Sequence, residues 1–308
     1  MRSPEFPPNL RWFNLPARLS AKTLVSAEAG SAPLQMKSLR GNHAVLVDFW
    51  TYSCVNCIRA LPHIKGWHEK YAKFGLVIVG VHTPEFEFEK NVENVARAVK
   101  EFGIEYPVAM DNDYQIWSLY SNNVWPHEFL MNKDGVIVYD HAGEDAYAAT
   151  EEAIRAALKE INPDLNLPAT IEAALPSEAS AKEGICLPVT PETYLGAMRG
   201  RPGRTWNFSG DWKIYPEYIE HEGKTEVFAD YLTLNFEAAE VNLVMGAEGE
   251  RAAKVRIELN GKPLNELEVH EPKMYNLLRG QKNIKGELRV FAKDRGLRVY
   301  AFTFGGCA

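Results

Sequence analysis

The sequence is poor in the features that mark a disulfide scaffold, a membrane span or a nucleic-acid-binding protein. It has only four cysteines in 308 residues, so the fold cannot depend on a dense set of disulfides. No apolar run reaches the roughly 18 residues that a membrane-spanning helix needs. The net charge is −7 and the pI is near 5.7. Since lysine and arginine form no long run either, we exclude nucleic acid and an anionic membrane as partners.

The chain also lacks a recognisable leader. Its first residues do not show a charged region followed by an apolar stretch and a small-residue cleavage site. Residues 1–6, MRSPEF, look like a cloning remnant. We therefore expect the natural protein to begin upstream of Pro7, with a signal peptide or a membrane anchor that was removed.

What is present is enough apolar sequence for two domains, because 46% of the residues are hydrophobic and 24% are charged. In the first half, strand-like and helix-like segments alternate, which predicts a βα sheet with buried strands. The expected strands are residues 44–50, 75–81 and 106–110, followed by a hairpin of 129–131 and 136–139 around a turn containing Asp-Gly. The expected helices are residues 54–74, 91–102, 114–120 and 146–161.

A change of composition separates the two halves. Residues 162–191 are rich in Pro, Ala, Ser and Glu and have weak periodicity, which is typical of a linker. From about Trp206 onward, short alternating strands are separated by turn signals, which predicts an all-β sandwich. We therefore divide the chain into a first domain (7–162), a linker (163–190) and a β domain (191–308).

Two thiols stand where the first long strand gives way to a helix. Cys54 and Cys57 enclose Val55 and Asn56, and this CVNC motif opens the helix. The unpaired N–H groups and the positive dipole end of a helix stabilise a thiolate at Cys54. Cys57, one turn along, is close enough to release a mixed disulfide by closing a ring. The spacing predicts a redox pair, whereas structural zinc would need a second pair of ligands, and the two remaining cysteines lie far apart.

The chain resembles the thioredoxin superfamily, and the resemblance extends well beyond the two thiols. Asp48 precedes Cys54 by six residues as in thioredoxins, and Pro62 matches the proline that kinks the active-site helix. Pro126 matches the cis-proline of the family, and the long stretch before it leaves room for the extra strand and helix of TlpA/ResA-like proteins. The segments that resemble the soluble part of DipZ-type proteins are DFWTYSCVNCIRALPHI, GVHTPEFEFEK, YPVAMDND, WPHEFLMNKDG, PETYLG and AFTFG.

This resemblance implies a fold and a set of roles. It implies an α/β thioredoxin-like domain followed by an all-β sandwich (jelly-roll-like) domain similar to carbohydrate-binding modules. Cys54 is then the nucleophile and Cys57 the resolving thiol, and Pro126 packs against their disulfide. Ser53 replaces the usual Trp and Val55-Asn56 the usual Gly-Pro, so neither redox potential nor substrates carry over.

Asp48 carries a physical argument of its own. It is a lone carboxyl group in an apolar strand, where desolvation raises the pKa and allows proton exchange with Cys57, directly or through a water. The alternative is an ordinary aspartate at a strand edge that faces solvent. The apolar residues on both sides favour the functional interpretation.

Four further residues are candidates for binding substrate. We expect Trp50, Tyr52 and Trp125 to form an apolar rim, with core packing as the alternative for Trp50. Glu85 matches the acidic residue that TlpA/ResA-like proteins bring near the disulfide. Alternatively, it belongs with Glu87 and Glu89 to a solvated acidic face.

The functional prediction is a thiol-disulfide oxidoreductase outside the cytoplasm, acting on protein disulfides as a reductant and needing no metal or organic cofactor. The resemblance implies a membrane electron donor similar to CcdA or DsbD. One alternative is a thiol peroxidase, because Thr51 and Cys54 fit a Thr-x-x-Cys pattern, although Val47 replaces its usual proline. Another is a non-enzymatic adaptor in which the β domain binds a glycan or a partner on a thioredoxin scaffold.

The β domain has two candidate features. Cys186 and Cys307 bracket it and could form a disulfide, which would contribute roughly 4–5 kcal/mol by closing a long loop. Aromatic side chains could stack on sugar rings, although aromatic residues in a sandwich are more often core. The candidates are Trp206, Trp212, Tyr215 and Tyr218.

Overall fold

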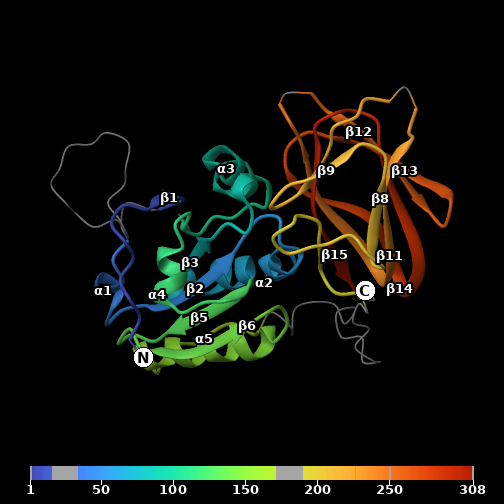
Figure 1. The fold of residues 1–308 in the computed structure, drawn as a ribbon. Helices are drawn as coiled ribbons and strands as arrows, with labels where there is room; N and C mark the ends of the chain where they lie inside the picture. Colours follow the sequence, from blue (N-terminus) through green and yellow to red (C-terminus); the bar gives the residue numbers. More distant parts are fainter. Residues whose placement is uncertain (1, 16–33, 171–189, 226, 250, 307–308) are drawn as a thin grey trace. The chain divides into compact units, whose positions relative to one another are not determined.

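In the computed structural model the chain forms two compact units, Met1–Ser180 and Ala181–Ala308 (Figure 1). The structure describes residues 2–15, 34–170, 190–225, 227–249 and 251–306. Most of the expected linker lies outside these residues, and so do Cys186 and Cys307. A disulfide between these two cysteines therefore stays a prediction.

The first unit is built on a six-stranded sheet with the order β1-β4-β3-β2-β5-β6. Strands β2, β3 and β4 run parallel, and β1, β5 and β6 pair antiparallel with their neighbours. The strands are β1 (Arg11–Phe13), β2 (Ala44–Trp50), β3 (Leu76–His82), β4 (Val108–Met110), β5 (His127–Met131) and β6 (Ile137–Ala142).

Helices cover both faces of this sheet and create two cores. One core packs residues of α2, α3 and α5 against the sheet, and the other packs residues of α1 and α4 against the opposite face. The helices are α1 (Met36–Leu39), α2 (Val55–Tyr71), α3 (Val92–Glu101), α4 (Gln115–Leu119) and α5 (Tyr147–Ile161), with 3₁₀ turns η1 (Ala72–Phe74) and η2 (Glu87–Lys90). The predicted α/β thioredoxin-like fold is confirmed. The predicted elements differ from the observed ones by a few residues at their ends, and β1, α1 and η2 were not predicted.

The central strand β2 explains why the site lies where it does. All seven residues of β2 are buried, because it has strands on both sides and helices on both faces. Asp48 is the one charged residue in this strand. It lies opposite Gly80 on β3 and opposite Glu128 on β5. The sheet therefore holds a carboxyl group at its centre, close to the start of α2.

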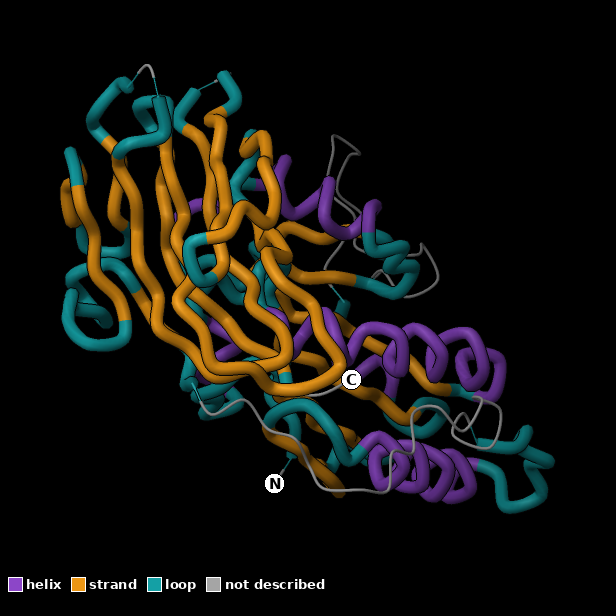
Figure 2. Tube along the Cα trace, turned by 90° about the vertical axis from the view of Figure 1, so that its right-hand side faces the viewer, coloured by secondary structure: helices purple, strands orange, loops and turns teal. Residues whose placement is uncertain are grey.

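The second unit consists of antiparallel strands that all belong to one nine-stranded sheet. Its path runs β13-β12-β14-β11-β15-β10-β9, and β7 and β8 pair with β15 and β11. Figure 2 shows these strands (orange) side by side. They are β7 (Thr193–Tyr194), β8 (Trp206–Ser209), β9 (Trp212–Ile214), β10 (Ile219–His221), β11 (Asp230–Ala247), β12 (Ala253–Leu259), β13 (Lys262–Val269), β14 (Lys273–Ala292) and β15 (Leu297–Gly305).

The length of β11 and β14 explains how one sheet encloses a core. These strands have 18 and 20 residues, and their pairing shifts register between Ala238 and Glu240 and again between Val241 and Asn242. Such irregularities bend a strand and increase its twist. The predicted all-β domain is confirmed, and its core is enclosed by one curled sheet.

Candidate active site

Cys54 occupies the N-cap position of α2. Its sulfur accepts a 3.2 Å hydrogen bond from the backbone N–H of Cys57, and its carbonyl accepts the N–H of Ile58 at 3.0 Å. Cap residues satisfy N–H groups that a helix leaves unpaired, and here a sulfur does so. Cys54 is half-buried and Cys57 is only 1% exposed. Both thiols are free. Because only Cys54 is partly exposed, an incoming disulfide reaches Cys54 and not Cys57.

Cys57 needs help to become a nucleophile. Burial, followed by its hydrogen bond and electrostatic interaction with Cys54, raises the pKa of the Cys57 thiol well above its usual value. The charge of Asp48 raises it further. At neutral pH Cys57 is therefore a protonated thiol, and its attack requires a nearby proton acceptor.

The surroundings of Asp48 disfavour its ionised form. It is 0% exposed, so the interpretation as an aspartate facing solvent is wrong. Burial raises the pKa of Asp48 well above its usual value, and the charge of Glu128 adds to this effect. Within the described part of the chain, both of its carboxyl oxygens lack a hydrogen-bond partner. A base without fixed partners is free to exchange a proton with Cys57.

Pro126 directly precedes β5, and its peptide bond with Trp125 is cis, as the resemblance implies. The half-buried Trp125 is held in place, because its indole N–H donates to the carbonyl of Thr83 at 3.1 Å and its ring lies 4.3 Å from that of Trp117. Trp125 and Cys54 are both partly buried and pack against the same core. Of the predicted rim residues, Trp125 is the one that stays partly exposed, and its place beside the nucleophile stays a prediction.

The other two predicted rim residues lie in the core. Trp50 is 1% exposed and Tyr52 is 4% exposed, so neither offers a surface to a protein substrate and the rim prediction is wrong for both. Their rings enclose His82, with centroids 5.2 Å and 5.7 Å from its ring. Gly80 makes room for this packing, because a Cβ there would lie 3.0 Å from the indole nitrogen of Trp50. Burial lowers the pKa of His82 to about 3, so this ring is neutral.

A buried acidic residue beside the motif is Glu89, which the sequence prediction named only in the alternative of a solvated acidic face. Glu89 is 0% exposed, whereas Glu85 is half-buried. One Glu89 oxygen accepts the hydroxyl of Ser53 at 2.6 Å and its N–H at 3.3 Å. The other accepts the N–H groups of Glu85 and Phe86 at 2.6 and 3.0 Å. Glu89 thus ties the residue before Cys54 to the loop after β3.

The protonation of Glu89 is set by competing effects. Burial, followed by the charge of Glu85, raises the pKa of Glu89 to about 7, although the hydrogen bonds from Ser53 and its neighbours act in the opposite direction. Alternating Glu and Phe residues at 85–89 suggest a solvated face. Glu89 is nevertheless turned inward. The groups that show this are the hydroxyl and the N–H of Ser53, which are distant from Glu89 in the sequence.

Glu128 is a second residue that the sequence analysis missed. It is 3% exposed, and the hydroxyl of Thr150 on α5 donates to it at 3.2 Å. Burial raises the pKa of Glu128 to about 7. A polar residue in the second position of a short strand gives no sign in the sequence that it faces another carboxyl group.

The second unit offers less to a ligand than the aromatic residues suggested. Trp206 and Trp212 are 2% and 8% exposed and belong to the core, which removes them as platforms for sugar rings. Tyr215 and Tyr218 are half-buried and stack on each other with centroids 4.9 Å apart. Among the described residues, no group of three or more His, Cys, Asp or Glu side chains is arranged to hold a metal ion.

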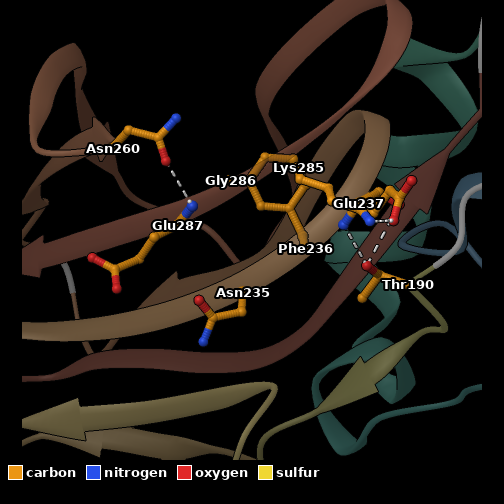
Figure 3. A pocket seen from close by; sticks show the side chains of 8 residues that line it. All are labelled: Thr190, Asn235, Phe236, Glu237, Asn260, Lys285, Gly286 and Glu287. Carbon is orange, nitrogen blue, oxygen red and sulfur yellow. Dashed lines mark hydrogen bonds and ion pairs between the residues drawn. The ribbon is translucent and has the colours of Figure 1, made fainter.

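A shallow hollow of about 580 Å³ lies on the second unit (Figure 3). The lining residues are polar apart from Gly286 and Phe236, and Phe236 is 5% exposed. A Cβ on Gly286 would lie 3.2 Å from the Phe236 ring, so the ring covers the glycine. The hollow thus presents no exposed ring face. It is lined by Thr190, Asn235, Phe236, Glu237, Asn260, Lys285, Gly286 and Glu287.

Two family models match the chain, one in each unit. Residues 18–140 match the AhpC/TSA family, and residues 200–305 match the thioredoxin like C-terminal domain. Together they cover the CVNC motif, the cis-proline and most of the curled sheet.

Curated relatives match both the whole chain and its first half. DipZ from Mycobacterium tuberculosis (strain CDC 1551 / Oshkosh) is 33% identical over 298 residues, which covers 90% of this chain and 41% of DipZ. The thiol-disulfide oxidoreductase ResA from Bacillus anthracis is 28% identical over 143 residues, covering 46% of this chain and 77% of ResA. The chain therefore spans about two fifths of the length of DipZ.

Among solved structures, a thiol:disulfide interchange protein of the thioredoxin family from Chlorobium tepidum TLS matches with a TM-score of 0.39 and 21% identity. The match covers 51% of this chain and 95% of that protein.

Proposed function

The chain belongs to the thioredoxin superfamily and is of the TlpA/ResA and DipZ type, and from this premise we propose that it reduces disulfides of protein substrates through Cys54 and Cys57. One observation carries the proposal. The sulfur of Cys54 is the reachable one and accepts a backbone N–H at the start of α2, while Cys57 lies buried one turn along. This arrangement separates an attacking thiol from a resolving thiol.

The reaction proceeds in two exchanges. The Cys54 thiolate attacks one sulfur of the substrate disulfide, forms a mixed disulfide, and displaces the first substrate thiolate. Cys57 then loses its proton and attacks the Cys54 sulfur, which releases the second substrate thiolate. The substrate disulfide gains two electrons, and the two cysteines lose two electrons as they form a disulfide.

Asp48 serves the second exchange. It accepts the proton of Cys57 in its carboxylate form and returns a proton when the disulfide is reduced again. Its burial supports this role, since a carboxyl group with a raised pKa has a proton affinity closer to that of a thiol than an exposed aspartate has.

The proposal extends to the surroundings of the protein. The redox work is carried by the two sulfurs without a metal or an organic cofactor. Substrates are proteins outside the cytoplasm, and electrons come from a membrane donor similar to CcdA or DsbD. Similarity to DipZ and ResA supports this setting. No helix of the described residues is long and apolar enough to cross a membrane.

Insulin reduction driven by dithiothreitol tests the proposal. We expect Cys54→Ser to lower the catalysed rate to background. Cys57→Ser is the matched control, because it keeps the nucleophile and should accumulate a mixed disulfide at Cys54 that mass spectrometry detects. Equal activity of wild type and Cys54→Ser would overturn the proposal.

The reduction potential of the pair gives the direction of electron flow. A value well below the cytosolic glutathione poise of roughly −240 mV would support a reductant. A value far above it, near that of a strong oxidant, would reverse the proposed direction and leave the exchange chemistry in place.

Thiol peroxidase activity is the second candidate, favoured by the match to the AhpC/TSA family. Thr51 stands three residues before Cys54, but its hydroxyl is buried and lies 3.3 Å from the Nε2 atom of His82. Peroxide consumption by wild type, lost in Cys54→Ser and exceeding the rate of insulin reduction, would favour this candidate.

A further inference from the structure

Two carboxyl groups lie directly opposite each other beside the resolving thiol. Asp48 on β2 and Glu128 on β5 are Cα partners in an antiparallel ladder. Side chains of directly opposite residues project from the same face of a sheet, with Cβ atoms about 5 Å apart. Asp48 is 0% exposed and Glu128 is 3% exposed. The two groups therefore share one space from which water is nearly excluded.

Neither carboxyl group has a cationic partner within the described part of the chain. The hydroxyl of Thr150 donates to Glu128, while the oxygens of Asp48 accept no hydrogen bond. Two adjacent buried carboxylates without a cation disfavour double ionisation, so that one of them retains a proton to higher pH. Asp48 and Glu128 therefore titrate as a coupled pair.

A basic residue lies beside the pair: His141 on β6 is the ladder partner of Glu128, and its Nε2 atom lies 3.2 Å from the carbonyl of Glu144.

The other groups around the pair add no positive charge. Cys57 faces it from α2, Tyr106 from the segment before β4, and Tyr147 from α5. Burial raises the pKa of each of these groups, to about 12 for Tyr147, so all three are neutral at physiological pH. From β3, Gly80 lies opposite Asp48 and contributes no side chain.

We propose that Glu128 is a positioning residue for the thiol-disulfide exchange, acting through Asp48 as the second member of a proton-sharing carboxyl pair. This inference rests on the proposed function. When Cys57 gives its proton to Asp48, the negative charge of Glu128 increases the affinity of Asp48 for that proton. When Glu128 instead holds the shared proton, Asp48 is left as the carboxylate that accepts the next one.

Glu128 also connects the pair to the surface. Thr150 donates to Glu128, and the hydroxyl of the half-buried Tyr139 lies 3.2 Å from the hydroxyl of Thr150. This chain of hydroxyl groups offers a path by which protons are exchanged with solvent. Asp48, which has no such contact, depends on Glu128 for this exchange.

The test is the pH dependence of ring closure by Cys57. Mixing the reduced full-length protein with 5,5′-dithiobis(2-nitrobenzoate) releases one thionitrobenzoate when Cys54 attacks and a second when Cys57 closes the ring. In wild type, we expect the rate at which the second thionitrobenzoate is released to rise with pH in two steps. In Glu128→Gln a single step should remain, complete about one pH unit lower, because the like charge next to Asp48 is gone.

Two further variants show whether Glu128 acts through Asp48. Asp48→Asn should lower the second rate about 10- to 100-fold and remove both steps. Adding Glu128→Gln to Asp48→Asn should then change nothing. Glu128→Asp, which keeps a carboxyl group, should retain the two-step profile.

Glu151→Gln is the matched control. Glu151 is also a buried glutamate of this unit, 1% exposed, but it binds Tyr71 and Lys70 and not the carboxyl pair. Its profile should match that of wild type. A Glu128→Gln profile identical to wild type, or one that still shifts in the Asp48→Asn background, would overturn the inference. Failure of wild type to release the second thionitrobenzoate would instead overturn the proposed function.

Discussion

A buried carboxyl group in the β unit and two buried carboxyl groups in the thioredoxin-like unit have opposite surroundings. In the β unit, Glu220 is 5% exposed and accepts the guanidinium of Arg298 at 2.7 Å. In the thioredoxin-like unit, Asp48 and Glu128 are as deeply buried but lack any cation among the described residues. A buried charge with a partner stays charged, whereas one without a partner changes its proton affinity. The difference separates a group that holds the fold together from groups suited to proton transfer.

The His221–Asp230 pair in the β unit follows the same rule. The two ring nitrogens of His221 lie 2.9 Å from the carboxylate of Asp230 and 2.9 Å from the carbonyl of Asp294. Burial acts to raise the pKa of Asp230, but hydrogen bonds from the N–H of Asp211 and from His221 outweigh it and hold this pKa below its usual value. The carboxylate of Asp230 is thus held in its ionised form.

The largest effect expected from this comparison concerns Asp48. Asp48→Asn should slow insulin reduction by about 10²-fold, equivalent to about 3 kcal/mol, because Cys57 loses its proton acceptor. Glu220→Gln also neutralises a buried carboxyl group, and it should leave the rate unchanged. Similar losses of activity in both variants would break the comparison.

The next effect is on stability in the β unit. Arg298→Met leaves Glu220 buried without a cation, and we expect the free energy of local opening to fall by about 2 kcal/mol, because Arg298 is itself partly exposed. Hydrogen exchange of the β10 and β15 amides measures this change. The exposed pair of Arg256 and Glu266 supplies the control, since Arg256→Met should cost less than about 0.5 kcal/mol. An equal loss of stability in Arg298→Met and Arg256→Met would show that burial does not strengthen the ion pair of Glu220.

A third effect should appear as a pH dependence of stability. The pKa of Glu128 is about 7 in the folded protein and near 4.5 otherwise, so between these values the folded state holds a proton that the unfolded chain has released. The stability contributed by Glu128 is therefore lost as pH rises through this window.

Glu128→Gln has no such proton to lose. Its unfolding free energy should therefore gain about 2 kcal/mol relative to wild type between pH 5 and pH 8. Urea unfolding of both proteins at the two pH values measures the gain. His82 titrates in both proteins, so its contribution cancels in the comparison. A difference that stays constant with pH would contradict the prediction.

The smallest effect concerns Ser53. Ser53→Ala removes one of the donors to Glu89, and the backbone donors remain, so the cost should be about 1 kcal/mol of stability and less than about a threefold loss of insulin reduction. Ser38→Ala, which removes an exposed hydroxyl bonded to the carbonyl of Gln35, should cost less in both assays. A large loss of activity in Ser53→Ala would give the Glu89 contact a part in the chemistry.

Local sequence patterns predicted the βα order of the first unit, the all-β second unit and the two thiols, and the resemblance to thioredoxins implied the fold. Apolar runs indicated β2 and β3, and the CVNC spacing together with a helix start indicated the redox pair. Glu128 could not be found this way, because only the register of β5 against β2 places it opposite Asp48. Trp50 was misplaced for a similar reason, since the space that it fills is created by Gly80 on another strand.

The sulfur of Cys54 is also the N-cap of α2. Once that sulfur is joined to another sulfur, it carries no negative charge and becomes a weaker acceptor for the amide of Cys57. The change is local, because the new disulfide links residue 54 to residue 57 across the first turn of the helix. The chemical shift and exchange rate of a single amide proton therefore report the oxidation state of the protein without any label.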